Sequence, residues 1–365
     1  MTEEIEPQEY GVTPALFLEW RTPRFGDQNP TKIQSQVWEW LVHSKLSGYQ
    51  STQKLNGPSA FDAGATWSFD RFGQSVTELP DGRIIYIAGE HEDYYDPDFY
   101  IYNDVVVVNP DDSVEFYCYS KDEFPPTDFH SATLLGNKII IIGNLGYYEE
   151  RNQSNTQIYL LNLDNFKIEK VNSSGNSPGW IHGHRAVLSA DRKFITVTKG
   201  KIDLGQEFSL RENIDDWQLD LQDWHWQRLT ERNWARWEIK RRDRKHNHLW
   251  DLRQALWSLE VKWEEHYQQD LKNLEKELGY RPDVNLIKDI YSFGFPCEQL
   301  PQDEDEYNVF RIKIDGVTVR FVEERYSVQA TVEGELPDEK IVELQNRTLS
   351  KISLLENTIC DLEVY

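Results

Sequence analysis

The sequence predicts a mainly β protein with α-helical additions, in which three four-stranded blades form part of an open propeller. Two observations predict this class. A strand–turn–strand pattern recurs three times at spacings of about 55 residues, and a second pair of strands follows each copy. Four antiparallel strands per repeat are typical of a propeller blade. We therefore divide the chain into an N-terminal covering segment with a strand and a helix (1–64), three blades (65–230), a long amphipathic Trp-rich helix (231–281) and a small acidic α+β domain (282–365).

The first strand pair of each repeat reads as a hairpin. The three copies are "FGQSVTELPDGRIIYIAGE" (72–90), "FHSATLLGNKIIIIGN" (129–144) and "HGHRAVLSADRKFITVTKG" (182–200). Each has a strand, a tight turn with Asp-Gly, Gly-Asn or Asp-Arg, and a second strand rich in β-branched residues that ends at or near glycine. Three hairpins are therefore expected at equivalent places in three repeats.

The second strand pair follows each hairpin after a long polar loop. These pairs are "YNDVVVVNPDDSVEFYCY" (102–119), "TQIYLLNLDNFKIEKV" (156–171) and "DDWQLDLQDWHWQRL" (215–229). Propellers typically close with about four to eight blades, so three blades leave open edges. We expect the flanking segments or a second copy of the chain to cover them.

The repeats resemble the kelch family, as a short array of three repeats of the bacterial type. The resemblance covers residues 67–229 and depends on a His-Ser-Ala-like opening, glycines after the second strand and aromatic residues in the outer strands. The matching residues are His130, Ser131, Ala132 and Gly143 in the second copy, Ser75, Ala88 and Gly89 in the first, and His184, Ala186, Trp217 and Trp224 in the third, where "TKG" replaces the glycine pair. The resemblance implies a propeller-type fold. Kelch-like folds include oxidases and sugar isomerases, so it does not by itself assign an activity.

His130 and Ser131 are interpreted as structural rather than catalytic. Polar side chains at the start of an inner strand satisfy buried donors and acceptors between blades. The sequence has no G-x-S-x-G motif, and adjacent residues on a strand point to opposite faces. No catalytic residue is therefore predicted.

The segments on either side of the repeats are predicted to be largely helical. Residues 13–20 are expected to form a strand, and residues 29–48 a helix with Asn29 as N-cap and Gly48 at its end. Apolar residues recur at three- and four-residue steps from about 234 to 278, which indicates one long helix or a helical hairpin broken from it. In 282–365, strands over 308–334 precede a helix that begins at Pro337 and a final strand near 358–365.

Charge and composition limit the kinds of partner. A net charge of −24 disfavours binding to nucleic acid, and the basic cluster at 240–248 is expected to be a solvated helix face or to pair with acidic residues of the same chain. No signal peptide or membrane span is recognisable. Three cysteines without a C-x-x-C pair fit free thiols, so a cytoplasmic location without a bound cofactor is expected.

The candidate binding residues lie in loops at one end of the blades. The first loop combines carboxylates, an imidazole and tyrosines, and matching positions in the second and third repeats add to it. Carboxylates with an imidazole could hold a metal ion, but the spacing matches neither an EF-hand loop nor an H-E-x-x-H helix, so no metal site is predicted. The set is Glu90, His91, Glu92, Tyr94, Tyr95, Asp96, Asp98, Tyr100, Tyr147, Tyr148, His182, His184 and Arg185.

These features favour a non-catalytic protein–protein interaction module. Its partner is expected to be a protein, and its acidity favours a basic one, as for an inhibitor or immunity-type protein. A homodimer through the long helix or an open blade edge is a further expectation. The alternative is a sugar-binding protein or metal-dependent enzyme, with Glu90, His91, His184 and Arg185 around one blade end.

Overall fold

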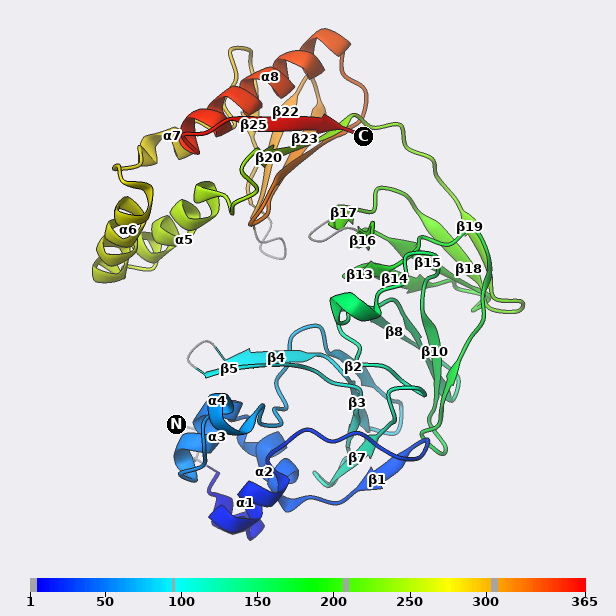
Figure 1. Cartoon of the computed structure of the whole chain (residues 1–365). Coiled ribbons are helices and arrows are strands. Elements are labelled where there is room, and N and C mark those ends of the chain that lie inside the picture. Colours follow the sequence, from blue (N-terminus) through cyan, green and yellow to red (C-terminus); the bar gives the residue numbers. More distant parts are fainter. Residues whose placement is uncertain (1–4, 94–95, 206–209, 303–307) are drawn as a thin grey trace. The chain divides into compact units, whose positions relative to one another are not determined.

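The computed structural model describes residues 5–365 except 94–95, 206–209 and 303–307. The chain divides into two compact units that meet between Arg232 and Asn233, and each is described by itself (Figure 1). Antiparallel sheets with added helices make up the described structure, which confirms the mainly β class with α-helical elements.

Three antiparallel sheets follow one another in the first unit, and we call them the first, second and third repeat sheets. In each, two consecutive strand pairs lie side by side in chain order. The first contains β2 (Ser75–Glu78), β3 (Ile84–Ile87), β6 (Val105–Val108) and β7 (Val114–Cys118). The second contains β8 (Ser131–Leu135), β9 (Lys138–Ile142), β10 (Ile158–Asn162) and β11 (Ile168–Lys170). The third contains β14 (Arg185–Leu188), β15 (Phe194–Thr198), β18 (Trp217–Asp220) and β19 (His225–Arg228).

Two short strands extend the outer edges of these sheets. The strand β1 (Thr31–Ile33) pairs antiparallel with β7, and β12 (Ser174–Gly175) pairs parallel with β19. The first and third sheets therefore have five strands each.

The loop after β9 contains the 3-10 turn Tyr148–Glu150, whereas further short strands lie in the loops after β3 and β15 and just before β14. They form the hairpin β4 (Glu90–Asp93) and β5 (Asp96–Ile101), and a small sheet of β13 (Ile181–His182), β16 (Lys201–Asp203) and β17 (Leu210–Glu212). We call this side of the first unit the loop end.

The four consecutive isoleucines of β9 are explained by burial on both faces of the second repeat sheet. Ile139 and Ile141 belong to the apolar cluster shared with the first sheet, whereas Ile140 and Ile142 belong to the cluster shared with the third. All four are 0% exposed. A strand covered on one face alternates apolar and polar residues, and a strand covered on both does not.

The outer face of the first repeat sheet is covered by the N-terminal segment. Its helices are α1 (Pro14–Trp20), α2 (Gln36–Ser44), α3 (Gly48–Lys54) and α4 (Ala60–Ala63). Trp38 of α2 stacks on Trp67 with ring centroids 4.8 Å apart, and Phe116 of β7 packs edge-on against both. These residues form one buried cluster with Val106 of β6, so the N-terminal helices replace a further sheet on this side.

Two predictions for the N-terminal segment are wrong. Residues 14–20 form a helix rather than a strand, because Pro14 starts the first turn and the Thr13 hydroxyl accepts a hydrogen bond from the Leu16 amide. The predicted single helix over 29–48 is instead β1, α2 and the start of α3. Ser35 is the N-cap of α2, and Lys45 ends it in the left-handed conformation.

Each strand that leads to the loop end leaves its sheet through residues with positive φ. Ala88, Gly143 and Lys199 occupy equivalent positions with φ of 53°, 76° and 58°, so the third repeat leaves its strand as the first does despite its Thr-Lys-Gly sequence. A Cβ on Gly143 would lie 2.4 Å from the Ile181 carbonyl oxygen of the next repeat. Glycine is therefore required here for the close approach of two repeats.

The second unit is a six-stranded sheet with helices. The strand order is β21 (Glu298–Gln299), β22 (Val309–Ile314), β23 (Val317–Glu323), β24 (Val328–Glu333), β20 (Arg236–Arg241) and β25 (Cys360–Val364). The helix α8 (Asp338–Leu355) lies across this sheet (Figure 1), and α5 (His248–Glu260), α6 (Glu264–Leu278) and α7 (Val284–Lys288) complete the unit. The strands and the helix predicted for residues 308–365 are present.

The predicted long helix over 231–281 is wrong as a single element. Residues 236–241 form the strand β20, in which Trp237 and Ile239 point into the core. The remaining part is a helical pair, α5 and α6, because the chain turns at Lys262 with φ of 64° and the two helices pack together. A three- to four-residue apolar spacing cannot distinguish one helix from two that pack against each other.

The predicted basic helix face over 240–248 is also wrong, because these residues span the end of β20, a turn and the start of α5. Arg241 is buried and pairs with Glu356 at 2.8 Å and with Asp243 at 2.7 Å, and Arg242 pairs with Asp361. The cluster therefore pairs with carboxylates of its own unit, which is the alternative that the sequence left open.

A membrane-spanning helix would have to be both long and apolar. Within the part of the chain that the structure describes, no helix meets both conditions.

Candidate binding site

The loop end brings ionisable side chains from all three repeats together. Glu90 follows the first repeat sheet, Asp128 precedes the second, and Arg151 lies in the loop after β9. His182 and Asp203 lie on β13 and β16 beside the third repeat sheet. These five residues are well separated in sequence, and the stacking of the sheets places them at one end.

Two carboxylates in this group have raised pKa values. Burial and the nearby charges of Asp128 and Glu92 raise the pKa of Glu90 to about 7. Burial raises the pKa of Asp128 to about 6, although its Oδ1 accepts a hydrogen bond of 2.6 Å from the Gly146 amide. The Oδ2 atom of Asp128 is buried and has no hydrogen-bond partner among the described residues. This part of the site thus carries negative charge that the folded chain does not fully compensate.

Arg151 fixes the position of the second-repeat loop. Its Nη1 donates to Asp203 Oδ2 at 2.8 Å, and its Nη2 donates to the Gly146 carbonyl at 3.2 Å. Gln153 donates to the other oxygen of Asp203 at 3.2 Å. The loop is therefore attached to β16. The Arg151 guanidinium forms its hydrogen bond to a carboxylate with Asp203 rather than with Glu90 or Asp128, the two carboxylates whose pKa values are raised.

Aromatic side chains border these groups, and two of them are exposed. Phe99 is 47% exposed and Tyr148 is 44% exposed. Tyr147 lies between the two loops, because its hydroxyl accepts a hydrogen bond from the Ile101 amide at 2.9 Å and its ring is 6.0 Å from that of Phe99. Tyr100 packs inward against Tyr102 at 4.9 Å. Among the described residues of these two loops, Phe99 and Tyr148 are the exposed aromatic side chains.

His91 and two aspartates form a separate group on the hairpin β4–β5. His91 Nε2 lies 3.4 Å from Asp93 Oδ1, and Asp98 Oδ1 accepts a hydrogen bond of 2.8 Å from the Asp93 amide. Burial favours neutral His91, but Asp93 and Asp98 outweigh that effect and raise the pKa of the imidazole. Asp96 pairs with Asp93 across the hairpin. Of the other sequence candidates on this hairpin, Glu92 is exposed, and Tyr94 and Tyr95 lie outside the described residues.

The histidines that open the second and third repeats connect neighbouring sheets. His130 Nε2 is 2.8 Å from Ser75 Oγ, and His184 Nε2 is 2.8 Å from Ser131 Oγ. Burial lowers the pKa of His130 to about 3 and that of His184 to about 4, so both are neutral at pH 7. A serine nucleophile needs a histidine that a third group orients, but His184 Nδ1 has no hydrogen-bond partner among the described residues. The His184–Ser131 pair is therefore structural.

The sequence candidates do not all meet at one site. The hydrogen-bond partner of His184 is Ser131, whereas His91 faces Asp93, and Arg185 is exposed on β14. The sugar site expected from Glu90, His91, His184 and Arg185 together is therefore not assembled. His182 is buried at the loop end with a pKa that burial lowers to about 3.

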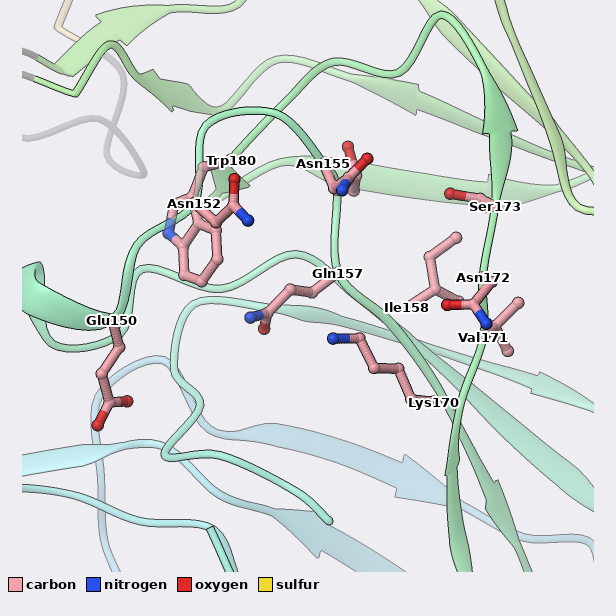
Figure 2. Close-up of a pocket in the computed structure, with 11 residues that line it drawn as sticks. Glu150, Asn152, Asn155, Gln157, Ile158, Lys170, Val171, Asn172, Ser173 and Trp180 are labelled. Carbon is pink, nitrogen blue, oxygen red and sulfur yellow. The ribbon is translucent and has the colours of Figure 1, made fainter. Parts of the chain in front are cut away.

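A polar cavity of about 310 Å³ lies at the same end, beside the outer strands of the second repeat sheet. Figure 2 shows Gln157 and Lys170 extending into it, with the Trp180 indole on one side and Asn172 on the other. The Gln157 Oε1 atom is buried and has no hydrogen-bond partner among the described residues. Amide groups, an ammonium group and an indole are typical of sites for polar small molecules.

Asp128, Arg151, Asp203 and the cavity were not identified from the sequence. Asp128 and Arg151 lie in loops and Asp203 lies on the short strand β16, none of them within a recognised local motif, and their proximity depends on how three sheets stack. The unpartnered atoms of Asp128 and Gln157 are visible only in the folded chain.

Comparison with known proteins leaves the family open. No family model and no curated protein matches the chain. Among solved structures, similarity is found to one described as "Structure of YjhT", with a TM-score of 0.34, 13% identity and coverage of 46% of this chain and 55% of that chain. A novel fungal alcohol oxidase of the AA5 family in complex with copper gives a TM-score of 0.28, 12% identity and coverage of 46% and 45%. The aligned part of this chain thus spans about half the length of each.

Proposed function

We propose that the three repeat sheets are kelch-like blades and that the chain is a non-catalytic binding protein, whose loop end holds a basic segment of a protein partner. In this proposal the N-terminal helices cover the first blade. The exposed aromatic side chains and the carboxylates with raised pKa values contact the partner. A reducing compartment such as the cytoplasm is part of the proposal, because the three cysteines are free.

The observation that carries this proposal is the uncompensated negative charge at Glu90 and Asp128. A carboxylate whose pKa is raised by burial and by other carboxylates gains stability when a cation approaches it. A lysine or arginine side chain from a partner supplies that cation, and it donates hydrogen bonds to the half-buried carboxylate of Glu90.

The exposed aromatic residues and the overall charge support the same class of partner. Tyrosine and phenylalanine at an exposed loop provide apolar contact area, and they attract cations over their ring faces. A net charge of −24 accelerates association with a basic protein and slows association with acidic ones. An inhibitor or immunity-type protein is the specific form of this proposal.

The proposal is tested by affinity purification of the tagged chain from its native host, with wild type and two variants in parallel. We expect a stoichiometric basic partner with wild type, its loss with Phe99→Ser combined with Tyr148→Ser, and its retention with Phe61→Ser. Phe61 is the matched control, because it is an exposed phenylalanine (73%) on α4, a helix that contacts β5, and it is not one of the residues of the proposed surface. Retention of the partner by the double variant, or no stoichiometric partner with wild type, would overturn the proposal.

A polar small molecule such as a sugar is the second candidate ligand, and the unpartnered Gln157 Oε1 in the polar cavity favours it. Binding of a sugar hydroxyl would satisfy this oxygen, and the Trp180 indole would contact an apolar sugar face. The test is a thermal-shift screen of neutral and acidic sugars. A ligand that stabilises wild type but not Gln157→Ala supports this candidate, and a shift that survives the substitution contradicts it.

A further inference from the structure

His91, Asp93 and Asp98 present three ligand atoms of the kind that bind transition metals. One nitrogen and two carboxylate oxygens lie within 4.8 Å of one another. Adjacent residues on a strand point to opposite faces, so this group faces away from Glu90 and is separate from the proposed partner surface.

The imidazole of His91 is oriented in the way that metal-binding histidines are oriented. Its Nδ1 lies 3.1 Å from the Asp70 carbonyl oxygen, which can only accept a hydrogen bond. Nδ1 therefore carries a proton, and in the neutral ring Nε2 has a lone pair. Most metal-binding histidines donate their second ring nitrogen to a carbonyl or carboxylate in the same manner.

The Nε2 atom of His91 is buried, makes no hydrogen bond among the described residues, and points at the aspartates. The residue as a whole is 8% exposed. A lone pair directed at a carboxylate oxygen 3.4 Å away is repulsive unless a cation lies between them or a proton sits on Nε2. The site therefore contains either an imidazolium–carboxylate pair or a bound metal ion.

The carboxylates are held in place by groups outside the cluster. Asp93 Oδ2 accepts a hydrogen bond of 2.6 Å from the Tyr49 amide at the start of α3, which leaves Oδ1 facing His91. Asp98 is 6% exposed and is oriented by the Asp93 amide. Such outer contacts fix ligand positions before a metal arrives and are characteristic of built metal sites.

We propose that His91, Asp93 and Asp98 bind one Zn²⁺ ion. Imidazole nitrogen and carboxylate oxygen are both ligands of Zn²⁺, whereas Ca²⁺ and Mg²⁺ prefer oxygen alone. Two carboxylates balance the two positive charges of the ion, and three protein ligands leave a fourth position for water. Bound zinc would join β4 to β5 of the hairpin that carries Phe99, and the Tyr49 amide of α3 already holds Asp93 in place.

The test is zinc binding to the full chain after removal of metals with EDTA. Titration against a chromophoric chelator should show one tight equivalent for wild type and for the control Glu92→Gln, whose carboxylate is exposed on the same hairpin. His91→Gln and Asp98→Asn should each weaken this equivalent at least tenfold. Cobalt substitution provides a second readout, since its visible spectrum should change when the nitrogen ligand is removed.

The alternative, an imidazolium–carboxylate pair, gives a different result. With that pair alone, wild type would bind no stoichiometric zinc, and its melting temperature would not change on adding the ion. Zinc uptake that is equal in wild type, His91→Gln and Asp98→Asn would place the metal elsewhere. Either outcome overturns the proposal, and circular dichroism of each variant without metal shows whether it is folded.

Discussion

The hydrogen bond between Ser131 and His184 is predicted to stabilise the contact between the second and third repeat sheets. Ser131 lies on β8 and His184 immediately precedes β14, and their Oγ and Nε2 atoms are 2.8 Å apart. The substitution Ser131→Ala removes the hydroxyl and adds no new group. It therefore tests one contact between two repeats.

The expected cost follows from what the substitution leaves behind. His184 Nδ1 has no hydrogen-bond partner in the described part of the chain, so Ser131→Ala deprives the second ring nitrogen of its partner as well. Leaving a buried polar atom unsatisfied costs about 1–3 kcal/mol. We expect the free energy of unfolding to fall by about 2 kcal/mol, near the middle of that range.

The third repeat provides a matched control. Ser174 Oγ and His225 Nδ1 are 3.0 Å apart, but this pair is exposed, and water replaces the hydroxyl when it is removed. Ser174→Ala should therefore change the free energy of unfolding by less than about 0.5 kcal/mol. Urea unfolding followed by far-UV circular dichroism measures both variants under the same conditions.

A double-mutant cycle makes the test specific. In a His184→Ala background, Ser131→Ala should cost almost nothing, because the unsatisfied nitrogen is absent. Equal costs for Ser131→Ala and Ser174→Ala would refute the reasoning from burial. An unchanged cost in the His184→Ala background would show that the serine acts through other contacts.

Three further predictions concern burial and charge. Glu90→Gln should match wild type at pH 3.5 and be more stable by about 1–2 kcal/mol at pH 8, measured by urea unfolding at both pH values. The reason is that the folded pKa of Glu90, about 7, exceeds its ordinary value of 4.5, so wild type loses stability as pH rises between the two. The full difference between the two pKa values of Glu90 corresponds to about 3 kcal/mol, and we expect less because the side chain is partly exposed. A difference in stability between variant and wild type that does not change with pH would contradict this prediction. Ile141→Ala should lower the free energy of unfolding by about 2–5 kcal/mol, because Ile141 is 0% exposed. Thr196→Ala, on the outer face of the third repeat sheet, should lower it by less than about 0.5 kcal/mol. Similar losses at the two positions would contradict the assignment of faces. Glu356→Ala should lower the stability of the second unit by about 3 kcal/mol or more, because it leaves Arg241 buried without this partner and removes the acceptor for the His248 and Leu249 amides. Differential scanning calorimetry measures the unfolding of the variant. An unchanged transition of the second unit would show that this reasoning is wrong.

The repeat pattern was predictable from sequence because it is local. Strand, turn and β-branched strand occur within about 20 residues, and the four isoleucines of β9 indicate burial on both faces before any neighbour is known. Residues 14–20 and 236–241 were assigned wrongly, because a short apolar stretch fits a strand and a helix about equally well. Capping by Thr13 decides the first case, and pairing of β20 with β24 and β25 decides the second.

The candidate site was predictable only where its residues share one loop. Glu90, His91 and Asp98 were recognised from the composition of a single segment, although the structure divides them between two faces of a hairpin. Asp128 and Arg151 were missed because nothing in their local sequence distinguishes them. The raised pKa of Asp128 arises from burial, and the charge of Arg151 is paired with Asp203 beside another repeat. Sequence spacing encodes neither effect.

Three stacked sheets can be stable without closing a ring if the outer faces of the two end sheets are covered or polar, unlike the apolar faces of the middle sheet. The N-terminal helices bury the outer face of the first repeat sheet around Trp38 and Trp67, and the second sheet is apolar on both faces. Across the outer face of the third, the register places exposed Val187 opposite Thr196, Thr196 opposite Gln218 and Gln218 opposite Gln227. Terminal repeats with a polar outer face end an array in solvent. Three of the four residues in this row are polar, so the row offers a homodimer through an open blade edge little apolar area to bury, mainly that of Val187.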